Sequence, residues 1–220
     1  NIKIVDFIKQ IDLIKKNNFK FIHADNFENS LINLKGEKKI LLTIDDAFKS
    51  FYDQAWPILK NEKIPFLLFV NTRDVGNKGY MNWKQIKEIS KEKFVYIGNH
   101  SYSHGYLVDK TNDEISTDIN LAISDFKKNL NYNPIFFSYP FGEYSNNFKK
   151  IVKDIGFKYA FGQHSGVTDE TKNFYELPRF SINEKYGQIK RFELILKTVP
   201  LKFKSITPKE KYINNTSNPP

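Results

Sequence analysis

Short apolar runs alternate with amphipathic segments along the chain. Runs rich in Phe, Leu, Ile and Val are typical of buried strands, and they cover residues 19–22, 40–44, 65–70, 94–97, 135–138 and 157–161. Between them, apolar residues recur three and four apart, which predicts helices at 2–20, 25–34, 48–61, from 83 onward, and at 113–130, 146–156 and 188–196. This alternation predicts βαβ units with a parallel sheet and right-handed crossovers. A closed barrel and an open doubly wound sheet both fit the pattern.

Individual residues mark where these elements begin, end or break. Asn82 can cap the helix that follows it, and Gly156 can end the helix that precedes it. Pro57 falls inside the third predicted helix and predicts a kink or a break there. Pro178 cannot donate a ladder hydrogen bond, so we expect residues 176–180 to form an edge segment. The sequence has no glycine-rich phosphate loop, which argues against a nucleotide-binding fold.

Length and composition fit one globular domain. The chain has 220 residues, of which 40% are hydrophobic and 27% are charged. We expect this domain to span residues 1–205 and a polar tail to span 206–220. The lack of Cys excludes disulfides and cysteine-based metal sites, and no apolar run approaches transmembrane length. Residue 1 is Asn and opens no signal peptide, so we expect a fragment or a processed form, incomplete at its N-terminus.

The charge balance is basic, with 34 Lys and Arg against 25 Asp and Glu. The basic residues are scattered and form no arginine-rich arm, so a solvated lysine-rich surface is favoured over a nucleic-acid interface. An anionic cell-surface polymer stays open as a partner. The 20 Phe and 12 Tyr either fill the core or line a sugar-binding groove, and composition does not choose between these.

Polar side chains follow three of the predicted strands. Asp45 and Asp46 follow the second strand, which we expect to be buried on both faces. His100 and His104 follow the fourth strand, and the segment 138–142 ends the fifth. Successive strand side chains point to opposite faces, so the two aspartates can share one site only where the strand ends. Ligands bind at the carboxyl ends of parallel strands, so we expect these groups to converge.

The histidine spacing suggests a metal site. His100 and His104 are four residues apart, which on a helical turn places both imidazoles on one side. An added carboxylate would complete a set of two His and one acid, with open positions for water and substrate. The alternatives are solvated aspartates on a surface turn and loop histidines with local hydrogen bonds. Two of the chain's four His at ligand spacing favour the metal site.

Three motifs resemble those of the polysaccharide deacetylase family, the NodB-homology domain of carbohydrate esterase family 4. Thr43-Ile-Asp-Asp46 resembles its Thr-Phe-Asp-Asp motif, and His100-Ser-Tyr-Ser-His104 looks like its His-Ser/Thr-x-x-His motif. Tyr139-Pro-Phe-Gly142 is similar to its Pro-Tyr-Gly motif. The order and separations also fit, and the region before residue 70 looks most like the poly-N-acetylglucosamine deacetylase branch.

The resemblance implies a distorted (β/α) barrel of about seven parallel strands that binds a divalent ion. The ion would be zinc first, with cobalt, nickel or iron as alternatives, and its ligands would be Asp46, His100 and His104. Asp45 would be the general base that takes a proton from water. The implied reaction releases acetate from an N-acetylglucosamine-containing polysaccharide, which lies outside the cytoplasm or in the cell envelope.

The resemblance also implies residues that contact the substrate. The backbone N–H of Phe141 would stabilise the oxyanion together with the metal. Tyr139 belongs to the same motif and is expected to contribute to this oxyanion and substrate site. Tyr102 and Trp83 could flank a sugar, although core packing is the default for Trp83.

The chain departs from the family pattern at three places. Ala47-Phe48 replaces the usual Gly-Tyr, and a left-handed conformation there would be costlier with Ala. Ser138 replaces the arginine that usually precedes Pro-Tyr-Gly. Arg179 either reaches Asp45 in its place and keeps that carboxylate ionised, or is an ordinary surface arginine.

The third departure concerns the general acid. The family's late Leu-x-His motif is absent, because Leu194-Ile-Leu-Lys197 contains no His. His164 ends the strand at 157–161 and is the candidate that would protonate the leaving amine. A histidine ahead of the first helix, in sequence not present here, is the alternative. His23 is expected to be structural.

Two rival functions remain. A non-catalytic glycan-binding barrel would suit the altered general-acid region, although such a protein needs no open metal site. An O-acetyl esterase or another C–N hydrolase would use the same attack on an acyl carbon.

Overall fold

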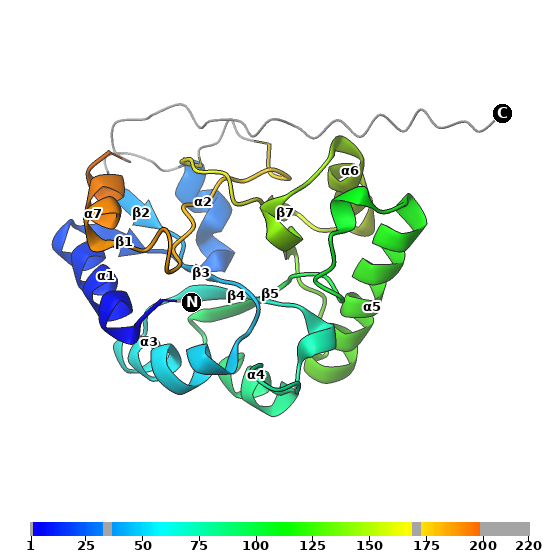
Figure 1. Ribbon diagram of the computed structural model, residues 1–220, viewed down its shortest axis with the longest axis horizontal. Helices are drawn as coiled ribbons and strands as arrows, with labels where there is room; N and C mark the ends of the chain where they lie inside the picture. Colours follow the sequence, from blue (N-terminus) through cyan, green and yellow to red (C-terminus); the bar gives the residue numbers. More distant parts are fainter. Residues whose placement is uncertain (1, 33–36, 169–172, 199–220) are drawn as a thin grey trace.

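The computed structural model describes residues 2–32, 37–168 and 173–198. In this part of the chain, seven short parallel strands lie in a curled arrangement, and helices cover its outside (Figure 1). The strands are β1 (Phe19–Phe21), β2 (Lys38–Ile40), β3 (Thr43–Ile44), β4 (Phe66–Val70), β5 (Val95–Asn99), β6 (Phe136–Ser138) and β7 (Tyr159–Phe161). The helices are α1 (Ile4–Lys16), α2 (Phe27–Ile32), α3 (Trp56–Glu62), α4 (Trp83–Ile89), α5 (Asn112–Leu130), α6 (Asn146–Ile155) and α7 (Ile189–Thr198).

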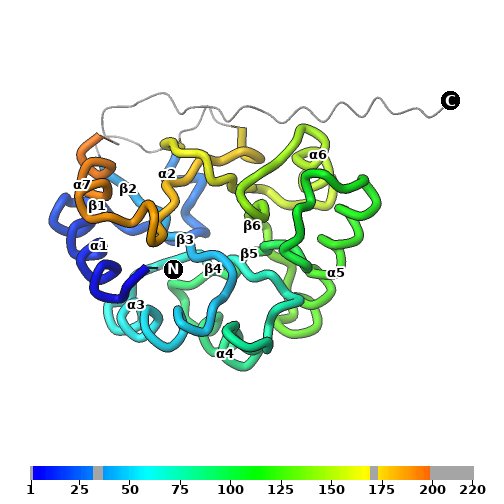
Figure 2. Tube along the Cα trace, in the orientation of Figure 1, coloured from blue at the N-terminus to red at the C-terminus, as the bar shows by residue number. Residues whose placement is uncertain are grey.

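The strands belong to two adjoining sheets. β1 pairs with β2, and β3 to β7 form a five-stranded sheet in sequence order. All the pairings are parallel. Figure 2 follows the chain around the curl, from α1 and α3 past α4 to α5 and α6. The α/β fold is thus confirmed, as a distorted barrel whose sheet forms a half-barrel. The carboxyl ends of β3, β5 and β6 lie at one edge of it, as parallel pairing requires.

The strand predicted at 40–44 differs from the prediction. It is split, since β2 ends at Ile40 and β3 begins at Thr43, and both pieces are half-buried rather than buried on both faces. β3 lies at the edge of the five-stranded sheet and pairs with β4 there. The carbonyl of Leu42 accepts a hydrogen bond from the Leu67 N–H, so the chain changes partner between the two pieces. An edge position leaves one flank open, which explains the partial exposure.

The helix boundaries follow the predicted capping residues. Asn82 and Gln85 form a capping box at the start of α4. Gly156 ends α6 in a left-handed conformation with φ +112°. The helix predicted at 48–61 divides into a π-helical turn and α3, with Pro57 in the first turn of α3. Proline is tolerated there because that N–H has no partner within the helix, so the predicted break is confirmed.

Phenylalanine fills much of the interior. The largest fully buried side chains include Phe66, Phe69, Phe126, Phe136, Phe137 and Phe148. Ring stacking continues across the sheet, since Phe136 lies 4.9 Å from Tyr159 between ring centroids. Core packing therefore accounts for these aromatic residues, whereas Phe141 is half exposed.

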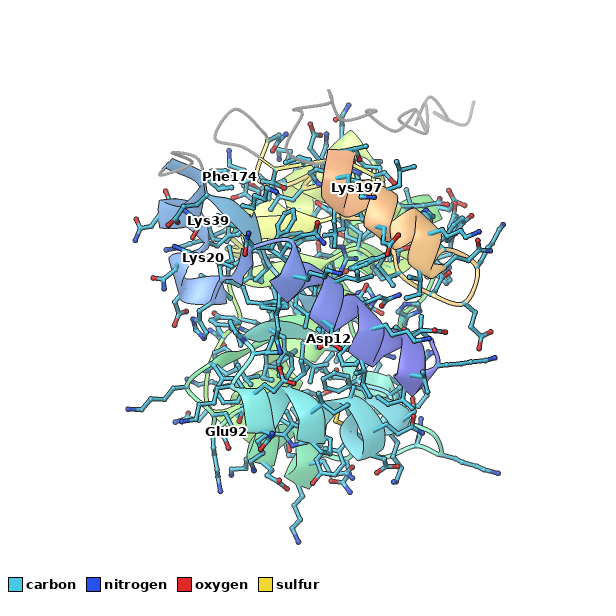
Figure 3. All side chains as sticks on the ribbon, turned by 90° about the vertical axis from the view of Figure 1, so that its left-hand side faces the viewer. Asp12, Lys20, Lys39, Glu92, Phe174 and Lys197 are labelled. Carbon is cyan, nitrogen blue, oxygen red and sulfur yellow. The ribbon has the colours of Figure 1, made fainter. Side chains whose placement is uncertain are left out.

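The C-terminal part of the described chain closes one side of the half-barrel. Figure 3 shows α1, which carries Asp12, between α7, which carries Lys197, and the helices below it. Leu177 pairs with Phe161 of β7 in an isolated parallel bridge, so the segment at 176–180 does lie along a sheet edge. No helix in the described ranges is long and apolar enough to span a membrane. The expected tail at 206–220 lies outside the described residues.

Candidate metal and catalytic site

Asp46, His100 and His104 bring their ligand atoms together after β3 and β5. His104 Nε2 lies 3.3 Å from Asp46 Oδ1, and His100 Nε2 lies 3.6 Å from the same oxygen. One candidate ligand atom from each residue lies within 4.8 Å of the other two. Ligands about 2.0–2.1 Å from a tetrahedral zinc ion are roughly 3.3 Å apart, so these three donors fit a small divalent ion.

The hydrogen bond of His100 fixes which nitrogen can bind a metal. His100 is buried, and its Nδ1 lies 2.7 Å from the carbonyl oxygen of Ser138. A carbonyl only accepts, so Nδ1 carries the hydrogen and Nε2 keeps its lone pair on the side of Asp46. Burial lowers the pKa of His100, although the Asp45 and Asp46 charges oppose this. The neutral imidazole that burial favours is the form that binds metals.

The histidine motif is a loop and not the helical turn that its spacing suggested. The backbone from His100 to Gly105, called the histidine loop below, contains no helix. Side chains hold the loop: Asn99 Oδ1 accepts from the Ser101 N–H at 2.7 Å, and Ser101 Oγ accepts from the His104 N–H at 3.0 Å. The two imidazoles still meet, with ring centroids 4.8 Å apart. The spacing therefore correctly predicted that the two histidines lie together, but the predicted helical turn is wrong.

Left-handed backbone conformations gather at this site. Among the described residues, eight non-glycine residues have positive φ, and five of them belong to the site: Asp46, Ala47, Ser101, His104 and Phe141. Such conformations cost about 1–3 kcal/mol each in non-glycine residues and persist where the surroundings enforce them. Asp46 at φ +73° turns its carboxylate out of the strand alternation, which lets it join the site beside Asp45. Ala47 adopts the left-handed conformation expected at that position, with φ +55°.

Arg179 forms a bidentate ion pair with Asp45. Its Nη1 donates to Asp45 Oδ1 at 2.8 Å, and its Nη2 donates to Asp45 Oδ2 at 2.9 Å. The remaining donors are also satisfied, by Thr43 Oγ1, Ser138 Oγ and the Gly162 carbonyl. The guanidinium also lies over the rings of Phe69 and Phe161. Arg179 is thus a fixed part of the site, not an ordinary surface arginine.

This ion pair sets the protonation state of Asp45. Burial alone would raise the pKa of Asp45, but the charge and the hydrogen bonds of Arg179 outweigh it, and the pKa is lowered from 3.8 to about 2. Asp45 is therefore ionised at neutral pH. His100 Nε2 lies 3.9 Å from Asp45 Oδ2, so this carboxylate also borders the three candidate ligands.

Strand alternation separates Ser138 from Tyr139. Ser138 Oγ faces the site, where it contacts both Arg179 and Asp45. The ring of Tyr139 points the other way and is fully buried beside Phe148 of α6. The Tyr139 hydroxyl donates to the Tyr175 carbonyl, and its backbone N–H donates to the Phe161 carbonyl. The expectation that Tyr139 contributes to the oxyanion or substrate site is therefore wrong, because both its donors serve the fold.

Phe141 and Tyr102 lie next to the histidines. The ring of Phe141 is half exposed, at 50%, and lies 4.9 Å from the His104 ring between centroids. The ring of Tyr106 lies 5.8 Å from the same Phe141 ring between centroids. Tyr102 belongs to the histidine loop, where its backbone N–H donates to Asp118 and its carbonyl accepts from the Arg73 N–H. Both residues are thus at the site, and their contact with substrate stays a prediction.

The other sequence candidates lie in different surroundings. His164 lies on the loop after β7, 6.0 Å from the Tyr144 ring between centroids, and its carbonyl accepts from the Arg179 N–H. Its function as an acid stays a prediction. His23 accepts the Asp25 N–H on Nδ1 at the start of a 3₁₀ turn, a structural function. The half-buried ring of Trp83 packs edge-on against Phe126, so core packing describes it.

Sequence reasoning missed Asp118, which binds the histidine loop from α5. It lies on the same face of the helix as Ile115, Ile119 and Ala122, all of which are buried. An ionisable residue in the middle of an apolar helical face is unusual unless it is paired. That position in the pattern could have identified it.

Comparison with known proteins places the chain in a family. A family model described as polysaccharide deacetylase matches residues 33–160, which is more than half of the chain. The poly-beta-1,6-N-acetyl-D-glucosamine N-deacetylase of Staphylococcus aureus (strain MSSA476) is 25% identical over 194 residues. That match covers 81% of this chain but only 66% of the relative's length. The putative polysaccharide deacetylase YxkH of Bacillus subtilis (strain 168) is 23% identical over 147 residues, which cover 67% of this chain and 52% of YxkH.

Solved structures share the fold. The Streptococcus pyogenes deacetylase PplD, in complex with acetate, superposes with a TM-score of 0.79 at 24% identity, covering 90% of this chain and 89% of PplD. IcaB from Ammonifex degensii superposes with a TM-score of 0.80 at 23% identity, covering 89% and 90%. The fold, the three motifs and the family model agree: the chain belongs to the polysaccharide deacetylase family.

Proposed function

We propose that the chain is a metal-dependent N-deacetylase of an N-acetylglucosamine-containing polysaccharide. The observation that carries this proposal is the contiguous arrangement of an ionised carboxylate, Asp45, beside two imidazoles and a second carboxylate. The bidentate clamp of Arg179 keeps Asp45 ionised beside these groups, which a general base requires and glycan binding alone does not. The overall reaction adds water across the amide C–N bond, which gives acetate and a free amine on the sugar.

Asp46, His100 and His104 would hold the ion. Two imidazole nitrogens and one carboxylate oxygen, with positions left for other ligands, form the donor set typical of catalytic zinc, and also suit cobalt, nickel or iron. A bound divalent ion supplies Lewis acidity, which acidifies water and polarises a carbonyl oxygen. The Ser138 carbonyl keeps His100 in the tautomer that leaves Nε2 available.

Asp45 is the proposed base. With a pKa of about 2 it is ionised over the whole physiological range and can accept a proton from the attacking water. The same low pKa makes it a weak base, so it needs a water that is already acidified. Arg179 orients both of its oxygens and takes the place of the arginine that usually precedes the Pro-Tyr-Gly motif.

The departing nitrogen also needs a proton. His164 is the proposed donor, since it lies on the loop after β7 and its carbonyl accepts the backbone N–H of Arg179, whose side chain reaches the site. The backbone N–H of Phe141 is the proposed donor to the oxyanion. The exposed Phe141 ring and Tyr102 would contact the sugar next to the scissile amide, because aromatic rings pack against sugar faces.

The names of the relatives support a substrate class. The curated relatives from Staphylococcus aureus are named for deacetylation of poly-beta-1,6-N-acetyl-D-glucosamine. We extend that substrate class to this chain as a proposal, together with action outside the cytoplasm or in the cell envelope, where such polymers lie.

Acetate release tests the proposed function. Purified protein with one equivalent of zinc is incubated with β-1,6-linked N-acetylglucosamine oligomers, with chito-oligomers and with an O-acetylated sugar. We expect acetate and new amines from an N-acetylated oligomer, loss of activity with a chelator and recovery with zinc. Release from the ester alone would make the chain an O-acetyl esterase, and no release from any substrate by zinc-loaded protein would contradict an enzymatic function.

A further inference from the structure

The Asp118 side chain accepts hydrogen bonds from two successive backbone N–H groups of the histidine loop. It is 9% exposed and lies in the first half of α5. Its Oδ1 accepts the Tyr102 N–H at 2.8 Å and the Ser103 N–H at 3.4 Å, and its Oδ2 accepts the Ser103 N–H at 3.1 Å. Both N–H groups belong to residues between the two histidines. A carboxylate that receives successive backbone N–H groups forms a strong, directional contact.

The loop needs such support because its backbone is strained. Ser101 has φ +67° and His104 has φ +49°, and both are outside the conformations that non-glycine residues prefer. Asn99 and Ser101 hold the two ends of the loop through their side chains. Asp118 holds the middle, where backbone hydrogen bonds of a helix or a sheet are lacking. His104 depends on this support more than His100, which follows directly from β5.

We propose that Asp118 is a positioning residue, whose carboxylate fixes the loop in the conformation that brings His104 Nε2 next to Asp46. The proposal rests on the proposed function, since the loop conformation matters for activity through metal binding. Among the described residues, the Asp118 carboxylate bonds to the backbone of Tyr102 and Ser103 and not to the side chains of the proposed metal ligands. Its effect therefore passes through the backbone of Tyr102 and Ser103.

The chemistry of the contact explains why a carboxylate is required. Both oxygens of Asp118 accept, and the Ser103 N–H lies between them. An amide has one acceptor oxygen, so in either orientation its NH₂ group would face a backbone N–H, that of Ser103 or that of Tyr102. Asp118→Asn therefore keeps the shape and part of the bonding, whereas Asp118→Ala removes all of it and leaves two partly buried N–H groups without this acceptor.

Zinc affinity of the metal-free full chain tests the proposal, measured by competition with a chromophoric chelator. We expect Asp118→Asn to weaken zinc binding about 10-fold and Asp118→Ala about 100-fold, the range found for residues that orient metal ligands. Asp125→Asn, the same change on the same helix, should leave affinity unchanged. Ile119→Val lowers stability at the neighbouring buried position without touching the loop, and should also bind zinc like the wild type.

Hydrogen exchange of the Tyr102 and Ser103 amides in metal-free protein gives a readout that does not depend on metal. We expect faster exchange in Asp118→Asn than in wild type and no change in Asp125→Asn. Unchanged exchange, or zinc affinity equal to wild type in both Asp118 variants, would overturn the proposal. If the wild type binds no zinc, the proposed function fails, and the exchange rates alone decide whether Asp118 fixes the loop.

Discussion

Arg179 holds Asp45 through both carboxylate oxygens, at 2.8 and 2.9 Å, although 133 residues separate them along the chain. The contact joins the end of β3 to the segment that runs beside β7, so it closes the half-barrel across the site. It also leaves Asp45 ionised next to the two histidines. The chemistry proposed for this protein depends on that combination.

Replacing Arg179 should raise the pKa of Asp45 and weaken its orientation. Burial already favours the protonated carboxylate, and without the guanidinium charge that effect is no longer offset. We expect Arg179→Ala to reduce kcat about 100-fold and to shift the acidic limb of the kcat/KM profile to higher pH. Arg179→Lys keeps a charge but loses the bidentate geometry, so an intermediate loss is expected.

Arg191→Ala is the matched control for Arg179. Arg191 bonds to the carbonyls of Ser181 and Tyr186, away from the carboxylates of the site. Its pH profile should equal that of the wild type. An unchanged acidic limb in Arg179→Ala would show that Arg179 does not set the protonation of Asp45.

Acid should remove a stabilising contribution of Asp45 in metal-free protein. The folded-state pKa is about 2, below the ordinary value of 3.8, so folding binds fewer protons at this group. The contribution is present above about pH 4 and is lost as pH falls toward about 2. Since one pKa unit corresponds to about 1.4 kcal/mol, the contribution of Asp45 to the free energy of unfolding is about 2 kcal/mol.

Denaturant unfolding with a chelator present measures this contribution. The difference in unfolding free energy between wild type and Asp45→Asn should shrink as pH is lowered from about 6 to about 3. A difference that stays constant over that range would mean that the pKa of Asp45 is not depressed in the folded protein.

A substitution of His164 should affect proton donation without affecting metal binding. His164→Asn should lower kcat by about 10²–10⁴-fold and remove the basic limb of the pH profile, because a general acid must be protonated to act. Zinc content should not change, since His164 is outside the three-residue cluster. His23→Gln, a change at a structural histidine, serves as control. Full activity in His164→Asn would assign proton donation to another group.

The fold was predictable because its local patterns agree with one another. Apolar runs located the strands, and capping residues such as Asn82 and Gly156 located helix ends. The break between Ile40 and Thr43 was not predictable, because it depends on a change of strand partner that periodicity does not encode. Likewise, the loop shape of the histidine motif depends on side chains from α5 and β5 that are known only once the fold is.

The site residues were predictable where a sequence motif fixes their spacing. Motif spacing brought Asp46, His100 and His104 together, whereas Arg179 was left open between a partner of Asp45 and a surface arginine, and the structure shows it paired with Asp45. Tyr139 was assigned wrongly because strand alternation was not carried through to the end of β6, where Ser138 faces the site and Tyr139 the core. Asp118 was overlooked because helical periodicity identifies the apolar face and does not show what a polar residue on that face contacts.

Zinc-edge anomalous scattering from crystals of the metal-loaded protein would locate the ion. We expect one strong peak bonded to Asp46, His100 Nε2 and His104 Nε2 at about 2.0–2.2 Å, beside Asp45. A map without a peak between these three side chains, or with the ion held by other residues, would contradict the proposed metal site.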